Sequence, residues 1–274
     1  MRLQQPSTLV PATPASALVF GGDTGMPVTA FDARDEAGEQ LVHLPTLAVP
    51  RDRRFRYDLN ADNCALRWAR VPKGHEGPVD VVIHFHGFSG VNAMKLADKA
   101  AASGIELRAP GVGRPTLGLV PHGVPFEWFD KKKKRLGDGF RFPQVATQAQ
   151  LDALVDEALQ SFGKLHGGKP TRGRLVLTCH SGGGAALSTL LATLKDYGQL
   201  HGCEYFDATY GGGATLAAAD GWLAKAIARD ASALARLAGE EARRGYLQSA
   251  GSHLRIVFLA GTDTAPIATA TDAF

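Results

Sequence analysis

The sequence predicts an α/β fold: a mostly parallel sheet flanked by helices on both faces, arranged as a three-layer sandwich. Runs rich in branched apolar residues, at 79–86, 174–179 and 254–259, alternate along the chain with segments of helical periodicity. These runs are largely apolar and do not alternate with polar residues, which is typical of parallel strands buried on both faces. Helices must then cover the two faces of the sheet.

The beginning of the chain differs in composition from the rest. Residues 1–50 are rich in Pro, Gly, Ala and Thr, and we expect an irregular N-terminal arm that could hold one or two edge strands. Residues 51–274 are expected to form one domain, beginning with an alternating, strand-like run at 54–60. Three elements should follow: a strand at 79–86, a helix at 92–103 that ends at Gly104, and a short strand at 115–120.

The second half of the domain repeats this alternation. Its clearest helix is 147–163, in which Leu151, Leu154 and Leu159 recur at helical spacing. The elements expected after it are a strand at 174–179, a helix through Leu187 and Leu194 closed by Gly198, a strand at 205–210, helices at 219–229 and 232–248, and a strand at 254–259. The carboxyl ends of parallel strands share one edge of a sheet. We therefore expect a ligand site where the loops after Gly87, Pro121, Cys179, Tyr210 and Gly261 meet.

Composition argues against several classes of protein. The 274 residues carry 30 basic and 27 acidic side chains, and this net charge of +3 is too mild to predict nucleic-acid binding. No apolar run approaches the ~20 residues of a transmembrane segment, and the N-terminus lacks the apolar stretch of a signal peptide. The three cysteines do not predict a disulfide framework. We therefore expect a cytoplasmic protein.

One basic run stands out, Lys131-Lys132-Lys133-Lys134-Arg135. A solvated loop tip is the expected structure, with localisation or anion binding as the alternative role. The run lies within residues 126–142, a loop whose aromatic residues could cover an active site and favour an apolar acyl group.

The stretch CHSGGG, residues 179–184, lies between a predicted strand and a predicted helix. A serine on such a turn projects its hydroxyl from the sheet edge, and the turn requires small neighbours, as in G-x-S-x-G. Ser181 and Gly183 fit this pattern, His180 lies between strand and serine, and Cys179 replaces the first glycine. The alternative is a glycine-rich turn that binds phosphate, but neither common phosphate-loop motif is present. The pattern favours Ser181 as a nucleophile.

A second motif, HGFSG at residues 86–90, follows an earlier strand and resembles the His-Gly oxyanion loop of the α/β-hydrolase superfamily. Its leading residues are His86 and Gly87. The resemblance implies that the backbone N–H groups of Phe88 and Gly182 form the oxyanion hole. The spacing of HGFSG, LVPHG and Trp128 is similar to the branch of polyester depolymerases and feruloyl esterases.

The same resemblance implies an acid after one of the next two strands. Asp263, in Gly-Thr-Asp, is the first choice and Asp207 the second, although either carboxylate could instead cap a turn or bond locally. The superfamily order is serine, acid, histidine, but no histidine follows Asp263. His122 and His86 lie near the correct edge and are weak candidates for the base. We expect a C-terminally truncated domain, with a base from a partner subunit in a homo-oligomer, or lost activity, as alternatives.

Together these features predict a serine carboxylic-ester hydrolase, lipase-like, that needs no cofactor and acts on a small-molecule or lipid-like ester. One alternative is a non-catalytic binding protein that keeps the hydrolase fold. Another is a metal-dependent hydrolase that uses His84 and His86, since two histidines at this spacing on a strand can bind zinc together. No metal is expected under the leading hypothesis.

Overall fold

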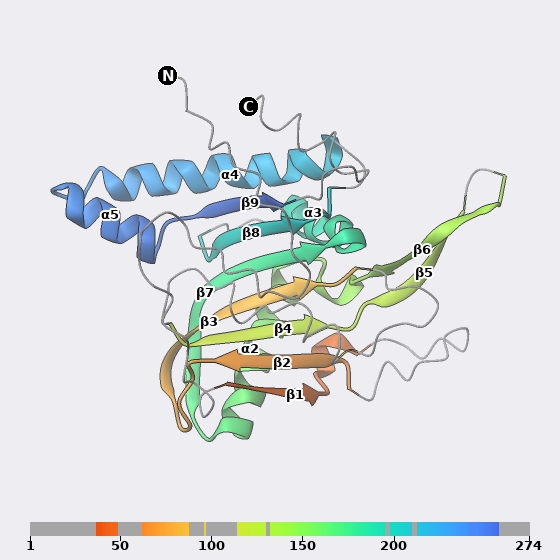
Figure 1. Ribbon diagram of the computed structural model, residues 1–274, viewed down its shortest axis with the longest axis horizontal. Coiled ribbons are helices and arrows are strands. Elements are labelled where there is room, and N and C mark those ends of the chain that lie inside the picture. The colour runs from red at the N-terminus through yellow and green to blue at the C-terminus, as the bar shows by residue number, and fades with distance from the viewer. Residues whose placement is uncertain are drawn as a thin grey trace, which may run out of the picture. The chain divides into compact units, whose positions relative to one another are not determined.

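The computed structural model describes residues 37–48, 62–87, 96, 114–129, 132–194, 198–209 and 213–257. These residues form a seven-stranded sheet in the order β1-β2-β4-β3-β7-β8-β9 (Figure 1). Strands β4, β3, β7, β8 and β9 run parallel to one another. At one edge of the sheet, β2 pairs antiparallel with β4, and β1 pairs antiparallel with β2. The strands are β1 (Gly38–Val42), β2 (Cys64–Ala69), β3 (Glu76–Phe85), β4 (Thr116–Pro121), β7 (Lys169–His180), β8 (Leu200–Phe206) and β9 (His253–Val257). The mostly parallel sheet expected from the sequence is confirmed.

Alternate residues of the central strands face two apolar layers. On β3, Val81 and Ile83 belong to the larger layer, which also contains buried residues of α2 (Gln148–His166) and α3 (Gly184–Thr193). Val82, between them, belongs to a smaller layer, in which it is buried with the helical residue Leu96. Helical residues therefore cover both faces of the sheet, as the three-layer prediction requires.

Helix α2 illustrates how local sequence sets an element's ends. Thr147 caps its N-terminus in a capping box with Gln150, and Gly167 ends it in the left-handed conformation, with φ 78°. Its apolar stripe packs against β7. The expected helix at 147–163 is confirmed and extends three residues further, to His166.

Several elements differ from the sequence prediction. Strand β8 spans Leu200–Phe206 rather than 205–210. The two late helices divide at residues 235–239, as α4 (Gly213–Leu234) and α5 (Glu240–Ser249). Residues 126–142, expected as a loop, instead contribute most of an antiparallel hairpin of β5 (Val124–Phe129) and β6 (Arg135–Arg141). The expected strand at 54–60 and most of the helix at 92–103 lie outside the described residues.

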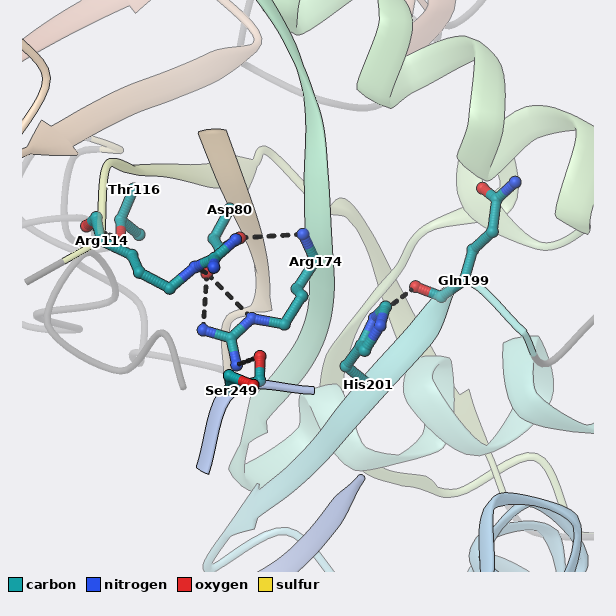
Figure 2. A network of polar contacts seen from close by, with 7 residues as sticks. All are labelled: Asp80, Arg114, Thr116, Arg174, Gln199, His201 and Ser249. Atoms are coloured by element: carbon teal, nitrogen blue, oxygen red, sulfur yellow. Dashed lines mark hydrogen bonds and ion pairs between the residues drawn. The ribbon is translucent and has the colours of Figure 1, made fainter. Parts of the chain in front are cut away.

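The amino-terminal edge of the parallel strands holds a buried charge network (Figure 2). Asp80 of β3, fully buried, accepts hydrogen bonds from Arg114 Nε at 2.8 Å and from Arg174 Nη2 at 2.9 Å. Arg174 also donates to the carbonyl oxygen of Ser249, at the end of α5. The network therefore joins β3, β7 and α5 at the edge opposite to the turn that holds Ser181. Burial lowers the pKa of Arg174, while the Asp80 carboxylate opposes this shift.

None of the helices in the described ranges combines the length and the apolar composition needed to cross a bilayer.

Candidate active site

The turn after β7 has the geometry that a nucleophilic serine requires. The strand ends at His180, a 3-10 turn covers Ser181–Gly183, and α3 starts at Gly184. Ser181 has a φ of 49°, in the left-handed region that is unfavourable for a residue with a side chain. Such strain persists only where the surrounding structure enforces it, and it clusters at functional sites. The backbone therefore forms the sharp strand-to-helix turn predicted from the sequence pattern.

Two of the three glycines after Ser181 are required by close backbone contacts. A Cβ atom on Gly183 would lie 2.1 Å from the carbonyl oxygen of Phe85, at the end of β3. A Cβ atom on Gly184 would lie 1.8 Å from the carbonyl oxygen of Ala208, just after β8. At Gly182, by contrast, no atom lies within 4 Å of an added Cβ. The turn is therefore held between the ends of its two neighbouring strands, and Gly182 keeps open space beside it.

The His-Gly motif lies directly beside the serine. A Cβ atom on Gly87 would be 2.7 Å from Ser181 Cβ and 3.0 Å from the carbonyl oxygen of His180. The structure thus brings together two motifs that are more than 90 residues apart in the chain. Phe88, expected to donate its N–H to the oxyanion, lies outside the described residues.

The ring of His86 is hydrogen-bonded through both of its nitrogens. Its Nε2 accepts from the Gly123 N–H at 3.0 Å, which places the ring proton on Nδ1, and Nδ1–H donates to the Gly87 carbonyl oxygen at 3.0 Å. The side chain is 3% exposed. His86 therefore joins the oxyanion-loop motif to the loop after β4, and it has no nitrogen available to take the Ser181 proton. These two hydrogen bonds do not favour His86 as the base.

Aromatic side chains from the hairpin cover this loop junction. Phe140 and Phe142 contact the His86 ring edge-on, with centroids 4.6 and 5.3 Å away. Gly123 allows this packing, because a Cβ atom there would lie 2.7 Å from Phe140 Cβ. Strand β6 also lies against the Ser181 turn. This packing of the hairpin base was not predicted from the sequence, although the alternation in Gly-Phe-Arg-Phe, residues 139–142, is a usable signal for a half-buried strand.

Asp207 is the candidate acid that the structure describes. It follows β8 directly. The register pairs His180 with Phe206, the last residues of β7 and β8, so Ser181 and Asp207 come directly after the ends of two neighbouring strands. Asp207 has a φ of 46°, and its N–H donates to the Val257 carbonyl oxygen of β9 at 2.6 Å. This bond fixes the backbone of a carboxylate at the same sheet edge as the serine. Asp263 lies outside the described residues.

Two further histidines lie near this edge but in different settings. His122 follows β4, its N–H donates to the Asn63 carbonyl oxygen at 2.9 Å, and its ring centroid lies 6.1 Å from that of His86. His84 is buried within β3, where its Nδ1 lies 2.7 Å from Thr178 Oγ1. In contrast, His201 and His253 are at the starts of β8 and β9, at the amino-terminal edge. His122 therefore lies at the carboxyl edge of the sheet, the edge at which Ser181 follows β7.

The donor set near His84 does not fit a metal centre. His86, the second ligand of that hypothesis, uses both ring nitrogens in hydrogen bonds with the protein. Within the described parts of the chain, no group of three or more His, Cys, Asp or Glu side chains is placed to hold a metal ion. This geometry gives the metal-dependent alternative no support.

Cys179 occupies the position where a glycine is usual. Its side chain is fully buried, and its thiol donates weakly to the Glu204 carbonyl oxygen at 3.6 Å. Burial raises the pKa of this thiol well above its usual value. Cys179 is therefore a protonated, packed residue beside the turn and does not compete with Ser181 as a nucleophile.

Comparisons with known proteins find solved structures of low similarity. No protein-family model matches the sequence, and no curated protein matches it. Among solved structures, an esterase B from Lactobacillus rhamnosis bound to a tributyrin phosphonate is 13% identical with a TM-score of 0.33, over 65% of this chain and 52% of that one. An acylaminoacyl peptidase from Pyrococcus horikoshii is 11% identical with a TM-score of 0.30, over 63% and 23%. A siderophore hydrolase from Aspergillus nidulans is 10% identical with a TM-score of 0.37, over 91% and 97%. The chain therefore spans about half of the esterase and less than a quarter of the peptidase.

Proposed function

We propose that this chain is a serine hydrolase that cleaves carboxylic esters, with Ser181 as the nucleophile. The observation that carries the proposal is the left-handed Ser181 on a strand-to-helix turn, with the Gly87 backbone beside its Cβ atom. A serine held in this way presents its hydroxyl at the carboxyl edge of the sheet, next to a loop that can supply a backbone donor.

In the proposed reaction, the Ser181 oxygen forms a bond to the ester carbonyl carbon while its proton passes to a histidine base. The carbonyl oxygen becomes an oxyanion, which the N–H groups of Gly182 and Phe88 stabilise. Collapse of this intermediate breaks the bond to the alcohol, which leaves with the proton from the histidine, and water then hydrolyses the acyl-enzyme. The acid that orients this histidine is Asp263, the first choice from the sequence, or Asp207, the second.

His122 is the candidate base that we propose to test first. It lies at the correct edge and next to the His86 ring that positions the oxyanion loop. A histidine base must come within about 3 Å of the serine oxygen in the reacting complex, although apo distances are often longer. Replacement of His122 by Gln should then abolish ester hydrolysis without unfolding the chain.

A fluorophosphonate probe with intact-mass readout tests the nucleophile directly. We expect the native chain to gain one probe and the Ser181→Ala variant to gain none. Ser188→Ala is the matched control, because Ser188 lies in α3 two turns further on and donates its hydroxyl to the Gly184 carbonyl oxygen. Folded protein that stays unlabelled would refute the proposal and leave the non-catalytic binding protein as the better hypothesis.

A further inference from the structure

The tip of the β5–β6 hairpin concentrates the positive charge of this chain. Residues 131–135 contribute five basic side chains, so the rest of the chain carries 25 basic and 27 acidic residues and is slightly negative. Lys132, Lys133 and Lys134 are all exposed in the structure. Lys133 has a φ of 61°, which marks the turn of the hairpin. The turn is therefore a local cluster of positive charge in a chain that is otherwise close to neutral.

The hairpin links this cationic tip to the candidate active site. Its base packs on the oxyanion-loop junction through Phe140, and β6 lies against the Ser181 turn. Each strand has six or seven residues, so the tip lies about 20 Å from the base. Figure 1 shows the hairpin leaving the sheet at the end where the parallel strands finish. A surface that holds the tip would therefore lie on the side of the molecule where Ser181 is.

The sequence of the hairpin favours a lipid surface over a nucleic acid. Strand β5 contains Trp128, and Trp is enriched at the membrane interface, where basic residues meet anionic head groups. The acidic residues Glu127 and Asp138 lie opposite each other in the hairpin register, so the strands carry negative charge between the basic turn and the base of the hairpin. A nucleic-acid site usually needs a basic stripe that follows the phosphate backbone over many ångströms.

We propose that the hairpin turn at Lys132, Lys133 and Lys134 binds an anionic lipid surface and so presents the carboxyl edge of the sheet to it. The substrate class that follows is an ester embedded in, or delivered from, an anionic membrane or micelle. This substrate class rests on the proposed hydrolase function, whereas the binding of the surface does not.

Vesicle co-sedimentation of Ser181→Ala protein tests the binding without any need for catalysis. The vesicles are phosphatidylcholine alone or phosphatidylcholine mixed with phosphatidylglycerol, whose anionic head groups attract basic segments. The test variant carries Lys132→Gln, Lys133→Gln and Lys134→Gln together. The matched control carries Lys73→Gln, Lys164→Gln and Lys169→Gln, three exposed lysines outside the hairpin. Both variants lose the same charge, so they separate a local site from a net-charge effect.

We expect the starting protein to bind only the anionic vesicles and to be released by added salt. Each lysine near such a surface contributes about a fivefold factor, so the tip variant should bind on the order of 100-fold more weakly. The control variant should bind within about twofold of the starting protein by the same reasoning. Equal binding by the tip variant would overturn the proposal, as would binding to a single-stranded oligonucleotide in place of the vesicles. Vesicle binding combined with absent fluorophosphonate labelling would refute the hydrolase function alone.

Discussion

Replacement of Asp80 by Asn should destabilise the fold more than any other single change in the charge network. The Asp80 carboxylate accepts five hydrogen bonds, two from the Arg114 guanidinium and three from Arg174, one of them from the Arg174 backbone N–H. An amide at this position has no charge, and its NH2 group would face guanidinium donors. The variant would therefore leave a buried cation without its counter-charge.

The two arginines differ in how much of this cost they carry. The Arg174 side chain is 6% exposed, whereas that of Arg114 is 38% exposed and can regain water when its partner is lost. Removal of one partner of a buried ion pair costs about 3–5 kcal/mol. We therefore expect Asp80→Asn to lower the free energy of unfolding by about this amount. Arg114→Ala should cost about 1 kcal/mol, as for a half-exposed pair.

Urea unfolding followed by circular dichroism measures both changes. The slope of the transition should stay constant, so that the shift in midpoint reports stability alone. Fluorophosphonate labelling of the folded variants should stay at the native rate, because the network lies at the edge opposite to Ser181. Equal losses for Asp80→Asn and Arg114→Ala, or a loss below about 1 kcal/mol for Asp80→Asn, would refute the claim that burial sets this cost.

Three further predictions concern the site and the thiols. Gly183→Ala should prevent folding or probe labelling, because the added Cβ atom would overlap a backbone carbonyl of β3. Gly182→Ala should preserve folding and labelling, because the added Cβ atom has open space, and similar thermal melts for the two variants would contradict this prediction. His86→Leu should lower the free energy of unfolding in urea by about 2 kcal/mol, because the buried Gly123 N–H loses its acceptor. The same variant should slow probe labelling of Ser181, and unchanged labelling would show that His86 does not position the site. Burial raises the pKa of all three cysteine thiols, so they stay protonated when folded but ionise above pH 9 when unfolded. The free energy of unfolding should then be fully retained below pH 9 and fall above it, by about 1.4 kcal/mol per pH unit for each thiol, and a flat urea profile to about pH 10 would contradict this.

The parallel sheet could be predicted because its central strands are locally unambiguous. Strands β3 and β7 are branched and apolar over the region that is buried on both faces, and this pattern depends on no distant partner. Strand β8 was misplaced because His201, Gly202 and Glu204 resemble a polar break in the sequence. In the fold, Glu204 is 1% exposed and pairs with Arg255 of β9 at 3.0 Å, a contact across 51 residues. Sequence periodicity alone does not show such a partner.

In the candidate site too, features set by neighbouring residues could be predicted, whereas features set by distant residues could not. The turn at Ser181 could be predicted because strand, serine and glycines are contiguous, and its φ of 49° agrees with that prediction. The role of His86 could not, because it depends on the Gly123 N–H, 37 residues away in the chain. The histidine base is a still more demanding problem, since its identity depends on where distant loops place one nitrogen.

The pairing of β3 with β7 also sets the order of events during synthesis. Asp80 and Arg174 are 94 residues apart, and β3 has no partner on that side until β7 exists. At about 5–20 residues per second, the ribosome needs about 5–20 s to deliver the second strand. During this interval the apolar edge of β3 is exposed to other chains, and non-local parallel pairing is intrinsically slow. The yield of native chain should therefore depend on elongation rate and on chaperones more strongly than its final stability suggests.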